Sequence, residues 1–213
     1  MTALAHEPTP EATRPYSELD EALWLAWQAA VEKLPEGFHA EIIEESIEVS
    51  PTGRYSHGRT ANDLRDGLVL FLAGSEYVAR QDMNVIHGRK VLIPDVFIAP
   101  RDTPEHVTED GIGIKASAVE MVVEVVSPGR TSVSRDRVRK RRAYARAGIP
   151  IYVLIDDHDE LGMVTLLTAP DPVQAVYDDE VRVPYGTAVT VPEGPAKGFT
   201  IDESITGAPR GPS

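Results

Sequence analysis

The 213-residue chain contains no cysteine, which excludes disulfide bonds, thiolate metal sites and cysteine nucleophiles. It has no apolar run that approaches the length of a membrane span, and residues 1–15 lack the apolar segment of a signal peptide. The sequence therefore predicts a soluble, cytoplasmic protein with no membrane partner.

Several catalytic motifs are missing as well. There is no Gly-rich phosphate loop and no Gly-x-Ser-x-Gly elbow, which argues against an NTPase and a serine hydrolase. The six histidines form neither a His-x-His nor a His-Glu-x-x-His pattern, so we expect no zinc site.

Basic residues are scarce, with 21 Lys and Arg against 34 Asp and Glu and a net charge of -13. A chain of this charge does not hold nucleic acid by bulk electrostatics, so any such contact must be local. The one basic segment lies in residues 130–146. Its arginines could grip phosphates, or they could neutralise the acidic surface of the chain itself.

The chain is long enough for one sizeable core. Residues 1–15 carry three prolines among small and polar residues, which is typical of a disordered tail. We expect a single domain over 16–206 and a frayed C-terminus over 207–213.

The first half of the domain predicts alternating helices and strands. Ser17 and Asp20 form a capping-box pattern before a helix that ends near Leu34, and Trp24 and Trp27 on it are expected to be core or interface anchors. Two short strands are predicted within 38–50, a helix over 56–72, and strands over 77–86 and 90–99 joined by a tight turn at 87–89.

The second half predicts a βαβ unit. Residues 119–126 are too apolar for a half-exposed strand, a helix follows from Ser132 or Ser134 to Gly148, and 151–155 is another buried strand. The two strands should be parallel neighbours, and 163–167 and 181–191 should be edge strands. The fold class is therefore α/β, with a mixed sheet flanked by helices.

Two acids stand in apolar runs. Asp95 follows Pro94 within 91–99, and Glu124 lies inside 119–126. A buried, unpaired carboxylate costs several kcal/mol, so two such acids suggest convergence on a cation. Simpler alternatives remain, because Asp95 could be a strand-end residue and Glu124 could pair with an arginine from 130–146.

The following helix offers the positive partner. Asp136, Lys140 and Tyr144 stand at successive i,i+4 positions and share one stripe, so Asp136 can orient the Lys140 ammonium while Tyr144 caps its other side. Taken alone, Lys140 is one charge among several arginines on a face that could simply be solvated.

These motifs together carry a resemblance. The segments Pro94-Asp95-Val96, 122–128 and 148–156, with the Asp136, Lys140 and Tyr144 spacing, resemble the Uma-two family of restriction endonucleases within the PD-(D/E)XK nuclease superfamily. Residues 41–44 and 50–51 and then His57 are similar to the early hairpin and the helix-opening histidine of that family. Glu44-Glu45 stands where the family has Asp-Gly. On base rates, a histidine at a helix start such as His57 is more often a cap or core residue than a ligand.

The resemblance implies a restriction-endonuclease-like PD-(D/E)XK core and a set of site residues. The superfamily has a lysine two residues after its last acid; this chain has Val126 there, and the resemblance implies that Lys140 replaces the lysine. The implied catalytic residues are Asp95, Glu124, Lys140 and Glu41. The implied ligands of Mg²⁺ or Mn²⁺ are Asp95, Glu124 and the Val125 carbonyl, which are hard oxygen donors. The implied supporting residues are His57, Asp136 and Tyr144.

We therefore expect a Mg²⁺-dependent endonuclease that hydrolyses DNA phosphodiester bonds. A homodimer is expected by analogy, because two sites related by a two-fold axis cut both strands of a duplex most easily. The alternative is a catalytically inactive nucleic-acid-binding or assembly protein that retains the fold. The net charge of -13 and Val126 favour this alternative.

Overall fold

The computed structural model describes residues 16–102 and 104–210, and within them the largest sheet has six strands in the order β11-β10-β9-β8-β6-β3. The strands β8 and β9 run parallel, and every other neighbouring pair in this sheet is antiparallel. Their bounds are β3 (Tyr77–Arg80), β6 (Val96–Pro100), β8 (Met121–Val125), β9 (Ile151–Asp156), β10 (Met163–Asp171) and β11 (Val176–Pro184).

The predicted parallel pair is confirmed in β8 and β9, whose side chains are all buried. The connection between them is helical throughout but not uniform. It consists of α3 (Arg130–Ser134), a π-helical segment (Arg135–Lys140) and α4 (Arg141–Arg146). The prediction of one regular helix over this stretch was therefore wrong for its middle part.

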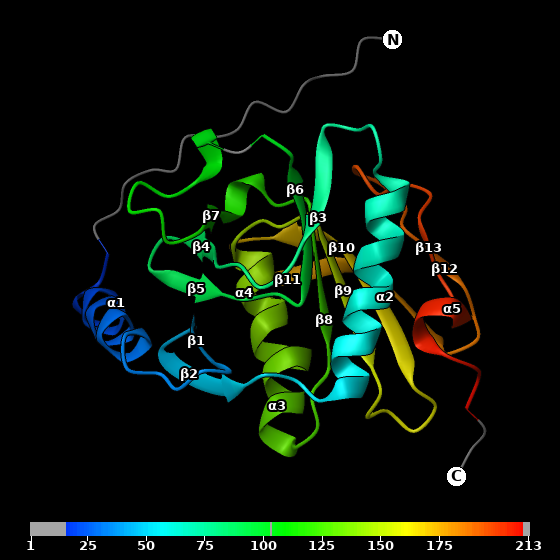
Figure 1. The fold of residues 1–213 in the computed structure, drawn as a ribbon, viewed down its shortest axis with the longest axis horizontal. Helices are drawn as coiled ribbons and strands as arrows, with labels where there is room; N and C mark the ends of the chain where they lie inside the picture. Colours follow the sequence, from blue (N-terminus) through cyan, green and yellow to red (C-terminus); the bar gives the residue numbers. More distant parts are fainter. Residues whose placement is uncertain (1–15, 103, 211–213) are drawn as a thin grey trace.

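Helices cover both faces of this sheet (Figure 1). The helix α2 (Tyr55–Phe71) packs on β3, β6 and β8, and its Leu64 and Leu68 are fully buried there. On the other face α4 packs on β10 and β11, and Tyr144 and Tyr152 are fully buried. The predicted mixed sheet flanked by helices is confirmed.

A second sheet of five strands has the order β2-β1-β5-β4-β7 within the described residues. It is covered by α1 (Glu18–Val31), where Trp24 and Trp27 stack with ring centroids 5.5 Å apart and Trp27 Nε1 donates to the Ala40 carbonyl. The predicted capping box at Ser17 and the core position of both tryptophans are confirmed. The strands are β1 (Phe38–Ile43), β2 (Ser46–Pro51), β4 (Val85–His87), β5 (Lys90–Leu92) and β7 (Ile114–Lys115).

The C-terminal segment completes the core on the α2 side. It contributes the apolar residues Val189, Phe199, Ile201 and Ile205. Its elements are β12 (Val189–Thr190), β13 (Thr200–Ile201) and α5 (Glu203–Thr206), and two single 3₁₀ turns stand earlier, at Pro104–His106 and Ala116–Ala118.

Two predicted strands are each divided in two, and this division shapes the site. The stretch 77–86 breaks between β3 and β4, and 90–99 breaks between β5 and β6. Pro94 has no N–H to donate to a ladder, and the Ile93 N–H donates to the Glu41 carboxylate instead of a strand partner. The chain therefore passes from the second sheet to the six-stranded sheet at Ile93, and Asp95 lies just before β6.

The predicted edge strands also need correction. β10 is nine residues long and lies inside the sheet, between β9 and β11, so of the two predicted edge strands only the second, at β11, lies at an edge. The stretch 181–191 is not one strand, because β11 ends at Pro184 and Gly186 adopts φ +86° before β12 begins in a separate sheet.

The ends of the chain test the domain limits only in part. Residues 1–15 and 211–213 lie outside the described residues, so the tail and the single-domain limits stay predictions. Within 207–210, Arg210 pairs with Asp157 at 2.6 Å and lies over the Tyr185 ring. No helix in the described part of the chain is long and apolar enough to cross a bilayer.

We expect Leu64→Ala to lower the free energy of unfolding by about 2–5 kcal/mol, because Leu64 is fully buried between α2 and the sheet. Chemical denaturation measures this loss. Leu70→Ala is the matched control on the same helix, since Leu70 is 77% exposed, and it should change the stability by about 0.5 kcal/mol or less. Equal losses in the two variants would contradict this packing.

Candidate active site

The predicted site residues surround one cavity of about 490 Å³, where the second sheet, α2, β8 and the π-helical segment meet. Six of the eight residues implied by the resemblance line it, namely Glu41, His57, Asp95, Glu124, Val125 and Lys140. The other two, Asp136 and Tyr144, are buried and contact residues of the wall.

Lys140 lies at the centre of the site, with only 2% of its surface exposed. Its Nζ is 2.9 Å from Glu124 Oε1, 3.0 Å from Glu41 Oε1 and 3.1 Å from the Ile93 carbonyl oxygen. An ammonium has three N–H donors, so these three acceptors satisfy it. Lys140 thus joins the six-stranded sheet, through Glu124, to the second sheet, through Glu41.

The π-helical segment explains why Lys140 reaches both sheets. One extra residue in the turn changes the i,i+4 register, and π segments often mark functional sites. The preceding residue, Arg139, also faces the second sheet, where its Nη2 donates to the Ile43 carbonyl at 2.8 Å. Two consecutive side chains therefore hold the β1–β2 hairpin against the helix.

The expected orientation of Lys140 by Asp136 was wrong. The Asp136 carboxylate accepts hydrogen bonds from Arg135 Nε at 2.8 Å and from the Ser127 N–H at 3.3 Å. The π register turns Asp136 away from the stripe that regular helical spacing predicts. Tyr144 acts on Glu124 and not on Lys140, because its O–H donates to Glu124 Oε1 at 2.5 Å.

Asp95 is fixed from two sides. Its Oδ2 accepts the Val125 N–H at 2.7 Å, and its Oδ1 lies 2.9 Å from His57 Nε2. The other ring nitrogen of His57, Nδ1, lies 3.3 Å from Ser127 Oγ. The observed contact of Val125 uses its N–H, and the role of its carbonyl as a metal ligand stays a prediction.

The backbone leaves little room around His57. A Cβ added to Gly53, in the loop before α2, would stand 2.8 Å from the His57 ring. A methyl group at that distance cannot be accommodated without moving the ring. The absence of a side chain at Gly53 therefore leaves the space that the His57 imidazole needs to contact Asp95.

The acids share a surplus of negative charge. Four carboxylates, those of Glu41, Asp95, Glu124 and Asp136, meet the two fixed cations Lys140 and Arg135. Burial raises the pKa of Glu124 well above its usual range, with further raising by Asp95, Asp136 and Glu41, although Lys140 opposes the shift.

Lys140 and Asp95 both stay charged. Burial lowers the pKa of Lys140, but the negative charges around it, those of Glu124 and Glu41 first and then Asp136 and Asp95, together outweigh burial, and the net shift is upward. Burial raises the pKa of Asp95, but His57, Lys140 and the Val125 N–H together lower it by more. Asp95 is therefore an ionised carboxylate at neutral pH.

The donor set fits a small divalent cation held partly by water. Glu41 and Glu124 each engage Oε1, and no hydrogen bond to Oε2 of either is found among the described residues. Asp95 supplies a third carboxylate to the same cavity. Among all residues that the structure describes, no three His, Asp or Glu side chains are close enough to enclose a metal by themselves. Mg²⁺ does not require such a cage, because it usually keeps several waters and binds through one or two carboxylates.

The sequence did not predict two residues that line this cavity, Ser127 and Arg135. Val126, at the position of the missing lysine, is buried in the core on the α4 side and does not line the cavity. Ser127 and Arg135 line the cavity but were not among the expected site residues. The signal for Ser127 was its position two residues after the end of β8, whereas Arg135 could not be distinguished from the neighbouring arginines by sequence.

The fold and these contacts define a class. A mixed sheet flanked by helices, with one acid just before β6 and one within the neighbouring β8, is the restriction-endonuclease-like fold. Residues 26–202 match the Uma2 family, described as "Putative restriction endonuclease", and the chain belongs to that family.

A solved structure agrees on the fold. It is a crystal structure described as "a putative nuclease belonging to DUF820" from Anabaena variabilis ATCC 29413, with a TM-score of 0.62 and 16% identity. The match covers 83% of this chain and 94% of that chain. Comparison with curated proteins gives no match.

We expect Lys140→Met to lower the free energy of unfolding at pH 7 by about 3–5 kcal/mol, because it leaves two buried carboxylates without their cation. Denaturation at several pH values measures this loss. Lys90→Met is the control, since the Lys90 pair with Asp20 is partly exposed, and it should cost about 1 kcal/mol or less.

The same variant should show a characteristic pH dependence. The folded-state pKa of Glu124 is already raised and loses its opposing charge in Lys140→Met. An acid whose pKa is higher in the folded state loses stability as pH rises from its unfolded to its folded pKa. The loss of stability in Lys140→Met relative to the wild type should therefore become smaller as the pH falls from 7 to about 5. A loss that is independent of pH would contradict this explanation.

Gly53→Ala should displace the His57 imidazole from Asp95 because of the close approach to the ring. The ¹⁵N and ¹H shifts of the His57 ring in NMR spectra measure this displacement. Gly58→Ala is the control, because a Cβ there meets nothing within 4 Å, and it should leave the ring signals unchanged. Unchanged His57 signals in Gly53→Ala would refute the role of Gly53.

Proposed function

We propose that the protein is an endonuclease that hydrolyses DNA phosphodiester bonds with Mg²⁺ or Mn²⁺. The observation that carries the proposal is that Asp95, just before β6, and Glu124, on the neighbouring strand β8, line one cavity with a surplus of negative charge. A divalent cation would neutralise that surplus. Membership of the Uma2 family supports the same activity.

Asp95 and Glu124 would hold the metal, with the Val125 carbonyl as a third ligand. When bound, the metal supplies Lewis-acid polarisation of the phosphodiester and lowers the pKa of a bound water. The chain fixes the two carboxylates in advance. The Val125 N–H and His57 orient Asp95, and Lys140 and Tyr144 orient Glu124.

The roles of Lys140 and Glu41 follow from their contacts. Because the three N–H donors of Lys140 are all engaged, its first role in this site is to hold Glu124 and Glu41 in place and balance their charge. Contact with a phosphate oxygen would require it to give up one of these acceptors. Glu41 lines the cavity, and its Oε2, for which no hydrogen bond is found among the described residues, is the atom that would orient water or bind a second cation.

His57 keeps Asp95 ready as a ligand. Burial lowers the pKa of His57, but the hydrogen bond and charge of Asp95, together with the charge of Asp136, raise it by more, so the net shift is upward. The imidazole Nε2–H then donates to Asp95 and keeps that carboxylate ionised. Ser127 Oγ, at the opposite ring nitrogen, fixes the plane of the ring.

The second candidate is a nucleic-acid-binding or assembly protein without activity. It is favoured by Val126 in the core and by the full engagement of Lys140. A homodimer and a cytoplasmic location also stay predictions from the sequence.

We expect the purified protein to nick supercoiled plasmid in Mg²⁺ or Mn²⁺ and not in EDTA. Asp95→Asn and Glu124→Gln should each lower the rate by about a hundredfold or more, because each removes a charge from the site. Asp178→Asn, which makes the same change at an exposed position on β11, should leave the rate unchanged. Gel electrophoresis measures the products.

The controls decide between the two candidates. Nicking that survives in both site variants would come from another site or a contaminant. Binding of DNA without any cleavage across metals and substrates would favour the inactive binding protein.

A further inference from the structure

Arg135 brings a positive charge to the cavity from the first turn of the π-helical segment. Its side chain is 12% exposed and lines the cavity together with Glu124 and Lys140. Its Nε donates to Asp136 Oδ1 at 2.8 Å, and Nη2 is 3.5 Å from Oδ2. No acceptor for Nη1 is found in the described part of the chain, so this nitrogen has donors to spare.

The guanidinium is held in place by a buried network. Asp136 is 1% exposed, and its carboxylate also accepts the Ser127 N–H. The Tyr152 O–H donates to the Asp136 carbonyl at 2.8 Å and fixes the backbone of the same residue. A ligand that binds Arg135 therefore does not have to order a free side chain, which lowers the entropic cost of binding.

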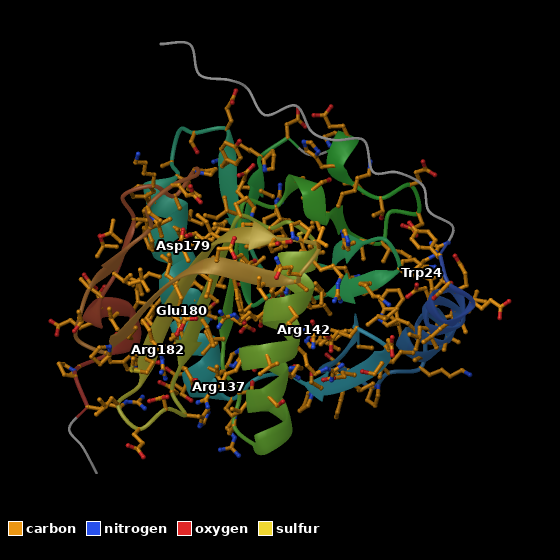
Figure 2. The ribbon with its side chains drawn as sticks, turned by 180° about the vertical axis from the view of Figure 1, so that it is seen from behind. Trp24, Arg137, Arg142, Asp179, Glu180 and Arg182 are labelled. Carbon is orange, nitrogen blue, oxygen red and sulfur yellow. The ribbon has the colours of Figure 1, made fainter. Side chains whose placement is uncertain are left out.

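Three neighbouring arginines of this helical connection are engaged in ion pairs elsewhere. Arg137 pairs with Asp156, Arg139 with Glu44 and Glu48, and Arg141 with Glu180, and none of them lines this cavity. Figure 2, seen from behind, shows Arg137 near Arg182 of β11, and both line a different hollow of about 240 Å³. Arg135 differs from this cluster in facing the acids of the site.

A phosphodiester needs such a group here. The cavity wall carries Glu41, Asp95 and Glu124, which repel an anion, and Lys140 has no free N–H to offer it. Arginine is the side chain that can bind a carboxylate on one edge and still present N–H donors to a phosphate on the other.

We propose that Arg135 binds a non-bridging phosphate oxygen of the substrate through Nη1, with Asp136 as the residue that positions it. The proposal rests on the nuclease function proposed above, since it takes the substrate to be a phosphodiester. It assigns Arg135 to substrate binding and removes it from the group of arginines that serve only the fold.

Binding of a 5′-fluorescein-labelled single-stranded oligonucleotide, followed by anisotropy in Ca²⁺ over a series of salt concentrations, tests the proposal. Arg135→Gln should weaken binding about tenfold to a hundredfold. It should also reduce the steepness of the salt dependence by about 0.7, the value for one contact with a single-stranded phosphate. Arg142→Gln is the matched control, because Arg142 is half exposed, pairs with Glu44 and lies outside the cavity.

The outcomes are separable. Equal affinity and salt dependence in Arg135→Gln and Arg142→Gln would overturn the proposal, while cleavage by the wild type would leave the nuclease function standing. A wild type that neither binds nor cleaves would overturn both.

A second variant covers the case in which Arg135→Gln unfolds. Arg135→Lys keeps the charge beside Asp136, but its single ammonium lacks the fork that serves two partners. Weakened oligonucleotide binding with an unchanged melting temperature would support the proposal. Wild-type affinity in Arg135→Lys would overturn it.

Discussion

The buried contact of Lys140 with Glu41 and Glu124 is the interaction on which the site depends. It lies where the two sheets meet, and each of its carboxylates comes from a different sheet. Buried ion pairs add little net stability compared with apolar packing, but removing one partner is expensive. Their value here is therefore geometric, because the ammonium fixes how far apart β1 and β8 stand. The π-helical segment delivers Lys140 and Arg139 to that junction from the crossover between the parallel strands.

The same junction determines where Asp95 lies. Glu41 accepts both the Lys140 ammonium and the Ile93 N–H, so the chain leaves the second sheet directly beside the ion pair. Pro94 prevents the ladder from continuing, and Asp95 then turns toward the Val125 N–H and His57 before β6 begins. A nuclease-like acid pair is thus assembled from a strand end and a strand interior. Both acids are oriented by groups of the fold before any ligand binds.

The sequence predicted the parts of this arrangement that depend on burial. Carboxylates in apolar runs carry a cost, and that cost pointed to Asp95, Glu124 and the compensating Lys140. It did not predict the division of 77–86 and 90–99 between two sheets, because both halves have the same apolar pattern and only tertiary contacts decide which ladder they join. It also missed the π-helical segment, whose extra residue leaves no mark on periodicity, and so gave Asp136 the wrong partner. The sequence also could not distinguish Arg135 from the neighbouring arginines, because all of them carry the same charge on one helical stretch.

The central claim is that the charge left over around Lys140 is matched by a divalent cation at Asp95 and Glu124. Anomalous diffraction from a crystal soaked in Mn²⁺ tests it most directly, because it locates the metal without relying on turnover. We expect an anomalous peak in contact with carboxylate oxygens of Asp95 and Glu124, with Lys140 still bonded to Glu124 and Glu41. Crystals at saturating Mn²⁺ with no peak at these two residues would contradict it.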